Sequence, residues 1–152
     1  MPDALQAAST GANVLIAGEG LPVRNHVRSL KIPGARISNG VRTASGAIVL
    51  LPDRMLASIG KYVILDTDFT DRGGGQRVVV DGTGVLVTFD VASVVTGGAG
   101  SVEVRYRLPL DATILSQLPA TECSVALSNA AAALLNPWQG SYSGGKPRDA
   151  AR

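Results

Sequence analysis

Apolar and polar residues alternate along residues 102–109, whose sequence is VEVRYRLP. Successive side chains of a β-strand point to opposite faces, so the alternation divides this segment into two faces. One face carries Val102, Val104, Tyr106 and Leu108. The other carries Glu103, Arg105 and Arg107, and Ser101, just before the segment, falls on the same side. The apolar face can cover a core, whereas the charged face can either bind an anion or remain solvated.

The same period of two recurs upstream of this segment, between glycine-rich breaks. In residues 85–91 every second residue is apolar, and Leu86, Thr88 and Asp90 lie on the mixed face. The strands expected in this part of the chain are residues 62–70, 76–81, 85–94 and 102–108. Glycine-rich segments separate them at 71–75, 82–84 and 96–100. This pattern is typical of an antiparallel meander.

The N-terminal third shows a weaker pattern. Residues 13–17 and 47–51 are apolar enough for short strands, whereas proline and glycine interrupt residues 20–46. Asn39-Gly40 is a strong tight-turn signal. We therefore expect residues 1–12 to form a loose arm and residues 20–46 to be irregular.

Helical periodicity replaces the alternation near the C-terminus. Residues 121–135 are rich in alanine and leucine, which favour helix. Thr121 is a plausible N-cap, Glu122 suits the positive end of the helix dipole, and Pro137 ends the helix. The expected organisation is an N-terminal arm (1–12), one domain (13–138) and a flexible tail (139–152).

These elements predict an α+β fold, in which an antiparallel meander is followed by a C-terminal helix. One helix is too small to cover the apolar face of a sheet with four or five strands. Either the sheet curls on itself or a second subunit supplies the cover, and the second alternative predicts a homodimer.

Composition is compatible with one soluble, cytoplasmically made domain of 152 residues. The formal charge is +2, with five basic and two acidic residues in the first 50 positions. A basic N-terminal third fits either a phosphate backbone or a solvated surface. Cys123 is the one cysteine, so no intrachain disulfide can form. No run of 18 apolar residues suggests a membrane span, and no signal-peptide pattern opens the chain.

Catalytic and metal-binding patterns are weak throughout the sequence. No residue near His26 in the sequence forms a pattern with it that would orient a catalytic histidine, and Cys123 is expected to be a small buried residue. Asp66, Asp68 and Asp71 fit a solvated strand face, or pairing with Arg72 or Arg77, better than a metal site. Gly73-Gly74-Gly75 lacks the Lys-Ser/Thr and the helix of a phosphate loop. We therefore expect a non-enzyme without cofactor or metal.

The C-terminal half resembles the coat proteins of the small single-stranded RNA bacteriophages. The resemblance covers residues 60–138 and depends on VEVRYRLPL at 102–110 followed by ATECSVALSNAAAALLNP at 120–137. The match is in the order and length of the segments and in their general pattern of residue types. Residues 1–46 depart from it, because they do not follow the opening hairpin of that family.

The resemblance implies a subunit that dimerises, closes into an icosahedral shell in the bacterial cytoplasm and becomes part of the virion. It also implies that the bare sheet face binds the single-stranded RNA genome, including an operator hairpin that represses translation. The RNA-facing residues would be Ser101, Glu103, Arg105, Arg107, Thr88 and Asp90. The alternatives are a phage decoration or tail-tube subunit without RNA, and a small β-rich ligand-binding module.

Overall fold

A computed structural model describes residues 1–11, 13–68, 76–125 and 135. Eight strands form one sheet in the order β4-β3-β2-β1-β7-β6-β5-β8, and every neighbouring pair is antiparallel. The strands are β1 (Ile16–Ile32), β2 (Ala35–Leu50), β3 (Arg54–Ile59), β4 (Tyr62–Asp68), β5 (Gln76–Asp81), β6 (Gly84–Asp90), β7 (Ala99–Arg107) and β8 (Glu122–Val125). The helices are α1 (Asp3–Ser9), α2 (Ala112–Ser116) and the 3-10 turn η1 (Val91–Ser93).

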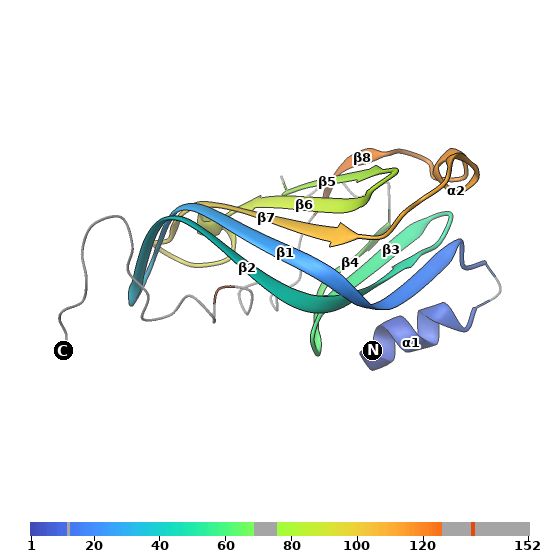
Figure 1. Cartoon of the computed structure of the whole chain (residues 1–152), viewed down its shortest axis with the longest axis horizontal. Helices are drawn as coiled ribbons and strands as arrows, with labels where there is room; N and C mark the ends of the chain where they lie inside the picture. Colours follow the sequence, from blue (N-terminus) through green and yellow to red (C-terminus); the bar gives the residue numbers. More distant parts are fainter. Residues whose placement is uncertain (12, 69–75, 126–134, 136–152) are drawn as a thin grey trace.

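The sheet curls around its own apolar face, and a long β1–β2 hairpin extends from one end of the molecule (Figure 1). The core inside the curl consists mainly of valine, leucine and isoleucine. Tyr106 of β7 crosses this core, and its hydroxyl donates a 2.8 Å hydrogen bond to the carbonyl oxygen of Ser58 in β3. In the strand order, β1 and β2 lie between these two strands. The bond therefore connects the two sides of the curl.

A glycine leaves the space that this crossing needs. A Cβ added to Gly46 in β2 would lie 2.4 Å from the carbonyl oxygen of Ser58 and 2.9 Å from the Tyr106 ring. Both distances are shorter than van der Waals contact. The absent side chain of Gly46 thus lets the tyrosine ring approach β3.

The N-terminal segment packs against the opposite face of the sheet. Leu5 of α1 is completely buried against Ala47, Val49 and Leu56. This contact explains why residues 47–51 are apolar without interruption, since both faces of that part of β2 are covered. Residues 3–9, expected to belong to a loose arm, are therefore helical and anchored.

The predicted α+β fold with a C-terminal helix is wrong for the described residues. They form a curled eight-stranded sheet with α-helices of only 7 and 5 residues. Glu122, expected in the first turn of the helix, lies in β8 and pairs with Val79 of β5. Thr, Cys, Ser and Val are weak helix formers, and the edge of β5 offers their backbone hydrogen bonds. Residues 126–134, the alanine-rich part of that prediction, lie outside the described residues, as does the expected tail.

The prediction that residues 20–46 are irregular is also wrong. They form most of the β1–β2 hairpin, which turns at Pro33-Gly34, where Gly34 has a φ of 83°. Asn39-Gly40 lies inside β2, opposite Arg28 and Val27. At this point β1 pairs with β2 on one side and with β7 on the other, and this pairing outweighs the local turn preference of Asn39-Gly40.

The curl provides one of the two expected ways of covering the sheet. The described residues of a single chain bury a common apolar core, so this core does not itself require a second subunit. A homodimer therefore needs support of another kind. Among the described residues, no helix has both the length and the apolar character needed to cross a membrane.

Candidate nucleic-acid interface

Strand β7 divides its side chains between the core and the outer face of the curl, as the alternation predicts. Val102, Val104, Tyr106 and Leu108 are buried. Ser101, Glu103 and Arg105 are half-buried, and Arg107 is exposed. The charged side of this strand therefore belongs to the outer face.

Strand register places the neighbouring polar residues on the same face. Thr88 of β6 lies directly opposite Glu103, and Asp90 lies opposite Ser101. Paired residues of an antiparallel sheet share a face. The structure thus places on one face all six residues that the sequence suggested for RNA: Ser101, Glu103, Arg105, Arg107, Thr88 and Asp90.

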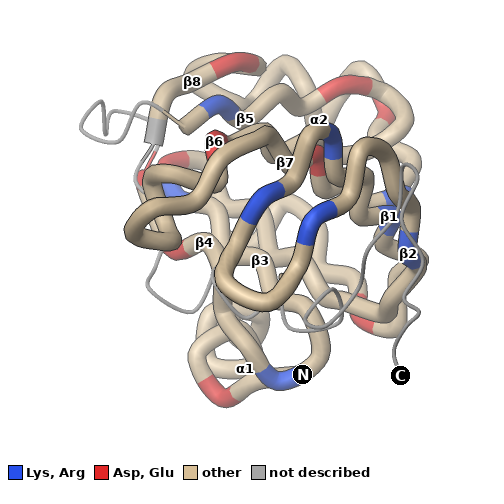
Figure 2. Tube along the Cα trace, turned by 90° about the vertical axis from the view of Figure 1, so that its left-hand side faces the viewer, with Lys and Arg blue, Asp and Glu red and all other residues tan. Residues whose placement is uncertain are grey.

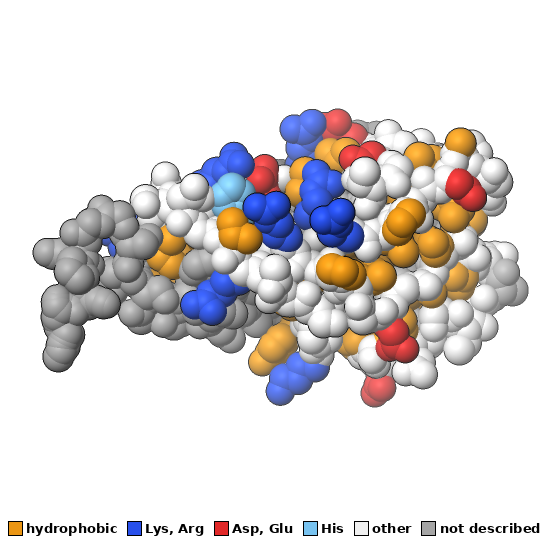
Figure 3. Space-filling view, in the orientation of Figure 1, with side chains coloured by type: hydrophobic (Ala, Val, Ile, Leu, Met, Phe, Trp, Pro, Cys, Tyr) orange, Lys and Arg blue, Asp and Glu red, His pale blue; other side chains and the backbone are white. Residues whose placement is uncertain are grey.

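Strand β1 contributes basic residues that the sequence analysis counted in a basic N-terminal third but did not place on this face. Arg24 lies opposite Arg105, His26 opposite Glu103, and Arg28 opposite Ser101. Basic side chains gather in the middle of this face, over β1 and β7 (Figure 3). The signal was present in PVRNHVR at residues 22–28, where every second residue from Arg24 onward is basic. Pro22 suggested a break in the strand next to this pattern. In the structure Pro22 follows a register shift between Gly18 and Leu21, where the missing N–H of a proline is tolerated.

Glu103 is the acidic centre of this basic cluster. Its Oε1 lies 3.5 Å from Nη2 of Arg28 and 3.8 Å from Nδ1 of His26. The other ring nitrogen of His26, Nε2, lies 2.5 Å from Oδ1 of Asn39. Glu103 therefore orients two basic side chains. Arg24 has no ion pair with any described residue and points its charge at solvent.

The cluster surrounds a shallow hollow of about 340 Å³. Its lining is Arg24, His26, Arg28, Leu86, Glu103 and Arg105. Leu86 supplies an apolar patch between the charged groups. Such a surface offers both a phosphate contact and a small apolar area for the flat face of a base.

A second hollow of about 500 Å³ lies beside it, at the turn between β5 and β6. Its lining is Gly82, Thr83, Arg105, Arg107, Leu108 and Pro109. Arg105 lines both hollows. It is held by a relay, since Nη1 of Arg105 donates to Oγ1 of Thr83 at 3.1 Å and this hydroxyl donates to Oδ1 of Asp81 at 2.6 Å.

The same relay changes the acidity of Asp81. Hydrogen bonds from the Thr83 hydroxyl and backbone N–H, with the nearby Arg105 charge, hold the pKa of Asp81 below its usual range. The carboxylate is thus kept ionised, and it orients Thr83 toward Arg105. Asp81 acts on this face as a positioning group.

The remaining candidate residues of the sequence analysis have other surroundings. Asp66, expected either on a solvated face or paired with Arg72 or Arg77, receives two hydrogen bonds of 2.9 Å from Arg54, and Arg77 pairs with Glu122 at 2.7 Å. Cys123 is half-buried in β8. Asp71 and the triple glycine lie outside the described residues. Within the described ranges, no three His, Cys, Asp or Glu side chains come together as a metal site.

Comparisons with protein-family models, with curated proteins and with solved structures give no match to this chain.

Proposed function

We propose that this chain is a structural coat protein whose outer sheet face binds single-stranded RNA. The observation that carries the proposal is the convergence of Arg24, Arg28, Arg105 and Arg107 on one face of two neighbouring strands. All four arginines line the two hollows described above: Arg24 and Arg28 line the first, Arg107 lines the second, and Arg105 lines both. An arginine fork donates two parallel hydrogen bonds to a phosphate, which makes it the preferred side chain for such contacts.

The shape of the face favours a single strand over a duplex. The hollows are shallow and lie between strands, and no described helix projects from this face to enter a groove of a double helix. Single-stranded RNA presents unstacked bases, which stack on guanidinium planes and on small apolar surfaces. Leu86 and Pro109 provide such surfaces next to Arg105.

The acidic residues set the strength of this interface. Glu103 holds Arg28 and His26 in place before RNA arrives, so less side-chain freedom is lost on binding. It also reduces the net positive charge at the centre of the face. Asp90 borders the face on β6, where its carboxylate repels phosphates that extend beyond the hollows.

The coat-protein part of the proposal is supported by the sequence resemblance and by the β1–β2 hairpin. Residues 1–46 departed from the family because they did not follow its opening hairpin, and a long hairpin does occupy this part of the chain. In this proposal the subunits dimerise, close into an icosahedral shell and turn the basic face toward the RNA in the virion. The partners are therefore further copies of the chain and single-stranded RNA.

Electron microscopy of protein purified from bacteria, with the absorbance ratio at two ultraviolet wavelengths, tests the whole proposal. Uniform round particles with nucleic-acid-dominated absorbance are expected. Tubes or rings without nucleic acid would favour a tail or decoration subunit. Small nucleic-acid-free species would favour a ligand-binding module.

A pair of variants tests the assignment of the face. Arg105→Ala with Arg107→Ala should reduce bound RNA without unfolding the protein, because neither side chain contributes to the core. The matched control, Arg54→Ala with Lys61→Ala, removes the same charge from β3 and its turn to β4. Equal RNA content in the two variants would contradict the assignment.

A further inference from the structure

The segment between Glu19 and Asp53 contains no acidic residue. It includes all of the β1–β2 hairpin except residues 16–19 of β1. Its basic residues are Arg24, His26, Arg28, Lys31, Arg36 and Arg42. Five lysines and arginines thus lie on the hairpin, although the formal charge of the whole chain is only +2. The hairpin is strongly cationic compared with the rest of the molecule.

An extra residue in β1 determines which way the outer half of the hairpin faces. Arg28 pairs with Ser101 of β7, but Lys31 pairs with Ala99, so β1 has one residue more than its partner. The irregularity is at Ser29, whose φ is 53°. This is a β-bulge, which changes the direction of the side chains that follow.

Gly100 of β7 accommodates the bulge. A Cβ at Gly100 would lie 2.4 Å from the carbonyl oxygen of Ser29 and 2.7 Å from that of Arg28, and its φ is 101°. Only glycine fits a position that is both this close to another backbone and in the left-handed region. The bulge and its glycine therefore form one local structure.

The consequence of the bulge is that Lys31 stays on the outer face. Ala99 and Ser101 are two residues apart on β7 and share a face, so their partners Lys31 and Arg28 share it too. Burial agrees, because both Val27 and Leu30 are buried although an uninterrupted strand would place them on opposite faces. Without the bulge, Lys31 would point toward the core.

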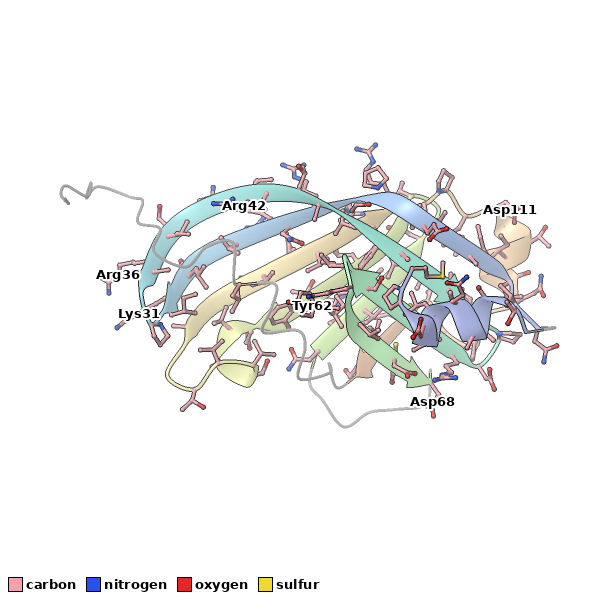
Figure 4. The ribbon with its side chains drawn as sticks, turned by 90° about the horizontal axis from the view of Figure 1, so that it is seen from below. Lys31, Arg36, Arg42, Tyr62, Asp68 and Asp111 are labelled. Atoms are coloured by element: carbon pink, nitrogen blue, oxygen red, sulfur yellow. The ribbon has the colours of Figure 1, made fainter. Side chains whose placement is uncertain are left out.

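Lys31 and Arg36 lie directly opposite each other beside the hairpin turn, and both are exposed. Figure 4 shows them together at the far end of the hairpin, and Figure 2 shows basic positions on both sides of the turn. Neither has an ion pair with a described residue. Like charges directly opposite each other destabilise a strand pair. A phosphate placed between them would convert this repulsion into attraction.

We propose that Lys31 and Arg36 form a second phosphate-binding point, so that one RNA strand follows β1 from the central hollows to the hairpin turn. The inference depends on the proposed RNA binding and adds its direction and extent. Arg24 and Lys31 are seven positions apart, which corresponds to roughly 20 Å of strand. An RNA that occupies only the central hollows would be too short to reach the turn.

Fluorescence anisotropy with labelled oligouridylates of increasing length tests this path, at several salt concentrations and with the full chain. The variant Lys31→Ala with Arg36→Ala is compared with the control Arg54→Ala with Lys61→Ala. Each phosphate contact on a single strand contributes about 0.7 to the slope of log affinity against log salt. The variant removes the contact with the one phosphate between these two side chains, so that slope should fall by about 0.7 for long oligouridylates.

The length dependence separates a local contact from a general loss of charge. For the shortest oligouridylate that the unaltered chain binds, the tip variant and the control should have the same slope. A loss that is equal at all lengths, or no loss at any length, would overturn the second binding point while leaving RNA binding by the central face intact. Failure of the unaltered chain to bind oligouridylate with a salt-dependent affinity would overturn both proposals.

Discussion

The bond between Tyr106 and Ser58 is the best place to test whether the sheet is closed as described. Tyr106→Phe removes the hydroxyl that donates to the Ser58 carbonyl oxygen at 2.8 Å and leaves the rest of the ring in the core. Both residues are 0% exposed, so water cannot replace the lost donor. Loss of one partner of a buried hydrogen bond costs about 1–3 kcal/mol. Because a carbonyl oxygen has a second lone pair, we expect about 1–2 kcal/mol of lost stability.

Urea unfolding followed by circular dichroism measures this loss. With a slope of roughly 2 kcal/mol per molar urea, the midpoint should fall by about 0.5–1 M while the slope stays constant. Tyr62→Phe is the matched control, since Tyr62 is 41% exposed and removal of its hydroxyl should change stability by less than about 0.5 kcal/mol. If the two variants unfolded at the same urea concentration, Tyr106 would not connect the two sides of the curl.

Four further outcomes are expected. Burial raises the pKa of Tyr106 above its usual range, so the stability that its protonated form contributes should be present below about pH 10 and lost as the pH rises further. Thermal melts at increasing pH should show this loss for the unaltered chain and not for Tyr106→Phe. Gly46→Ala should destabilise by about 1–3 kcal/mol in urea, whereas Gly82→Ala, whose added Cβ meets its nearest atom at 3.6 Å, should be near neutral. Thr83→Val should raise the pKa of Asp81 in an NMR titration and weaken oligouridylate binding less than Arg105→Ala does, because it only releases that guanidinium. Val104→Asp should prevent folding, since the carboxylate would be buried without a partner, and a folded variant by circular dichroism would mean that the faces of β7 are reversed.

Local alternation was enough to predict the strands that lie next to their sequence neighbours. The faces of β7 and β6 follow from a period of two, and the Gly82-Thr83 interruption is the turn that joins β5 to β6. The predicted positions of the outer-face residues on these strands depend on this pattern alone. Sequence reasoning therefore located the β6 and β7 residues of the candidate interface, but not those of β1.

Contacts between distant segments explain the rest. The pairing of β1 with β7 joins parts of the chain that no local pattern relates, and it supplies Arg24 and Arg28 to the interface. Thr121 was assigned to a helix from its own neighbourhood, but its carbonyl oxygen accepts a 2.7 Å hydrogen bond from the N–H of Val80. In both cases a hydrogen-bonding partner far along the chain outweighs local propensity.

The curl and the basic face depend on each other. A sheet that closes around its apolar side must be convex on the other side, and convexity spreads the ends of the outer side chains apart. Repulsion between neighbouring charges such as Arg24 and Arg105 falls with their separation. Tyr106, at the inner face of β7, closes the curl through Ser58, while Arg105 and Arg107 flank it on the outer face of the same strand. The alternation in β7 thus places the contact that bends the sheet on one face and the arginines on the other, where the bend reduces the repulsion between them. A variant that opened the curl should therefore also weaken the binding of RNA.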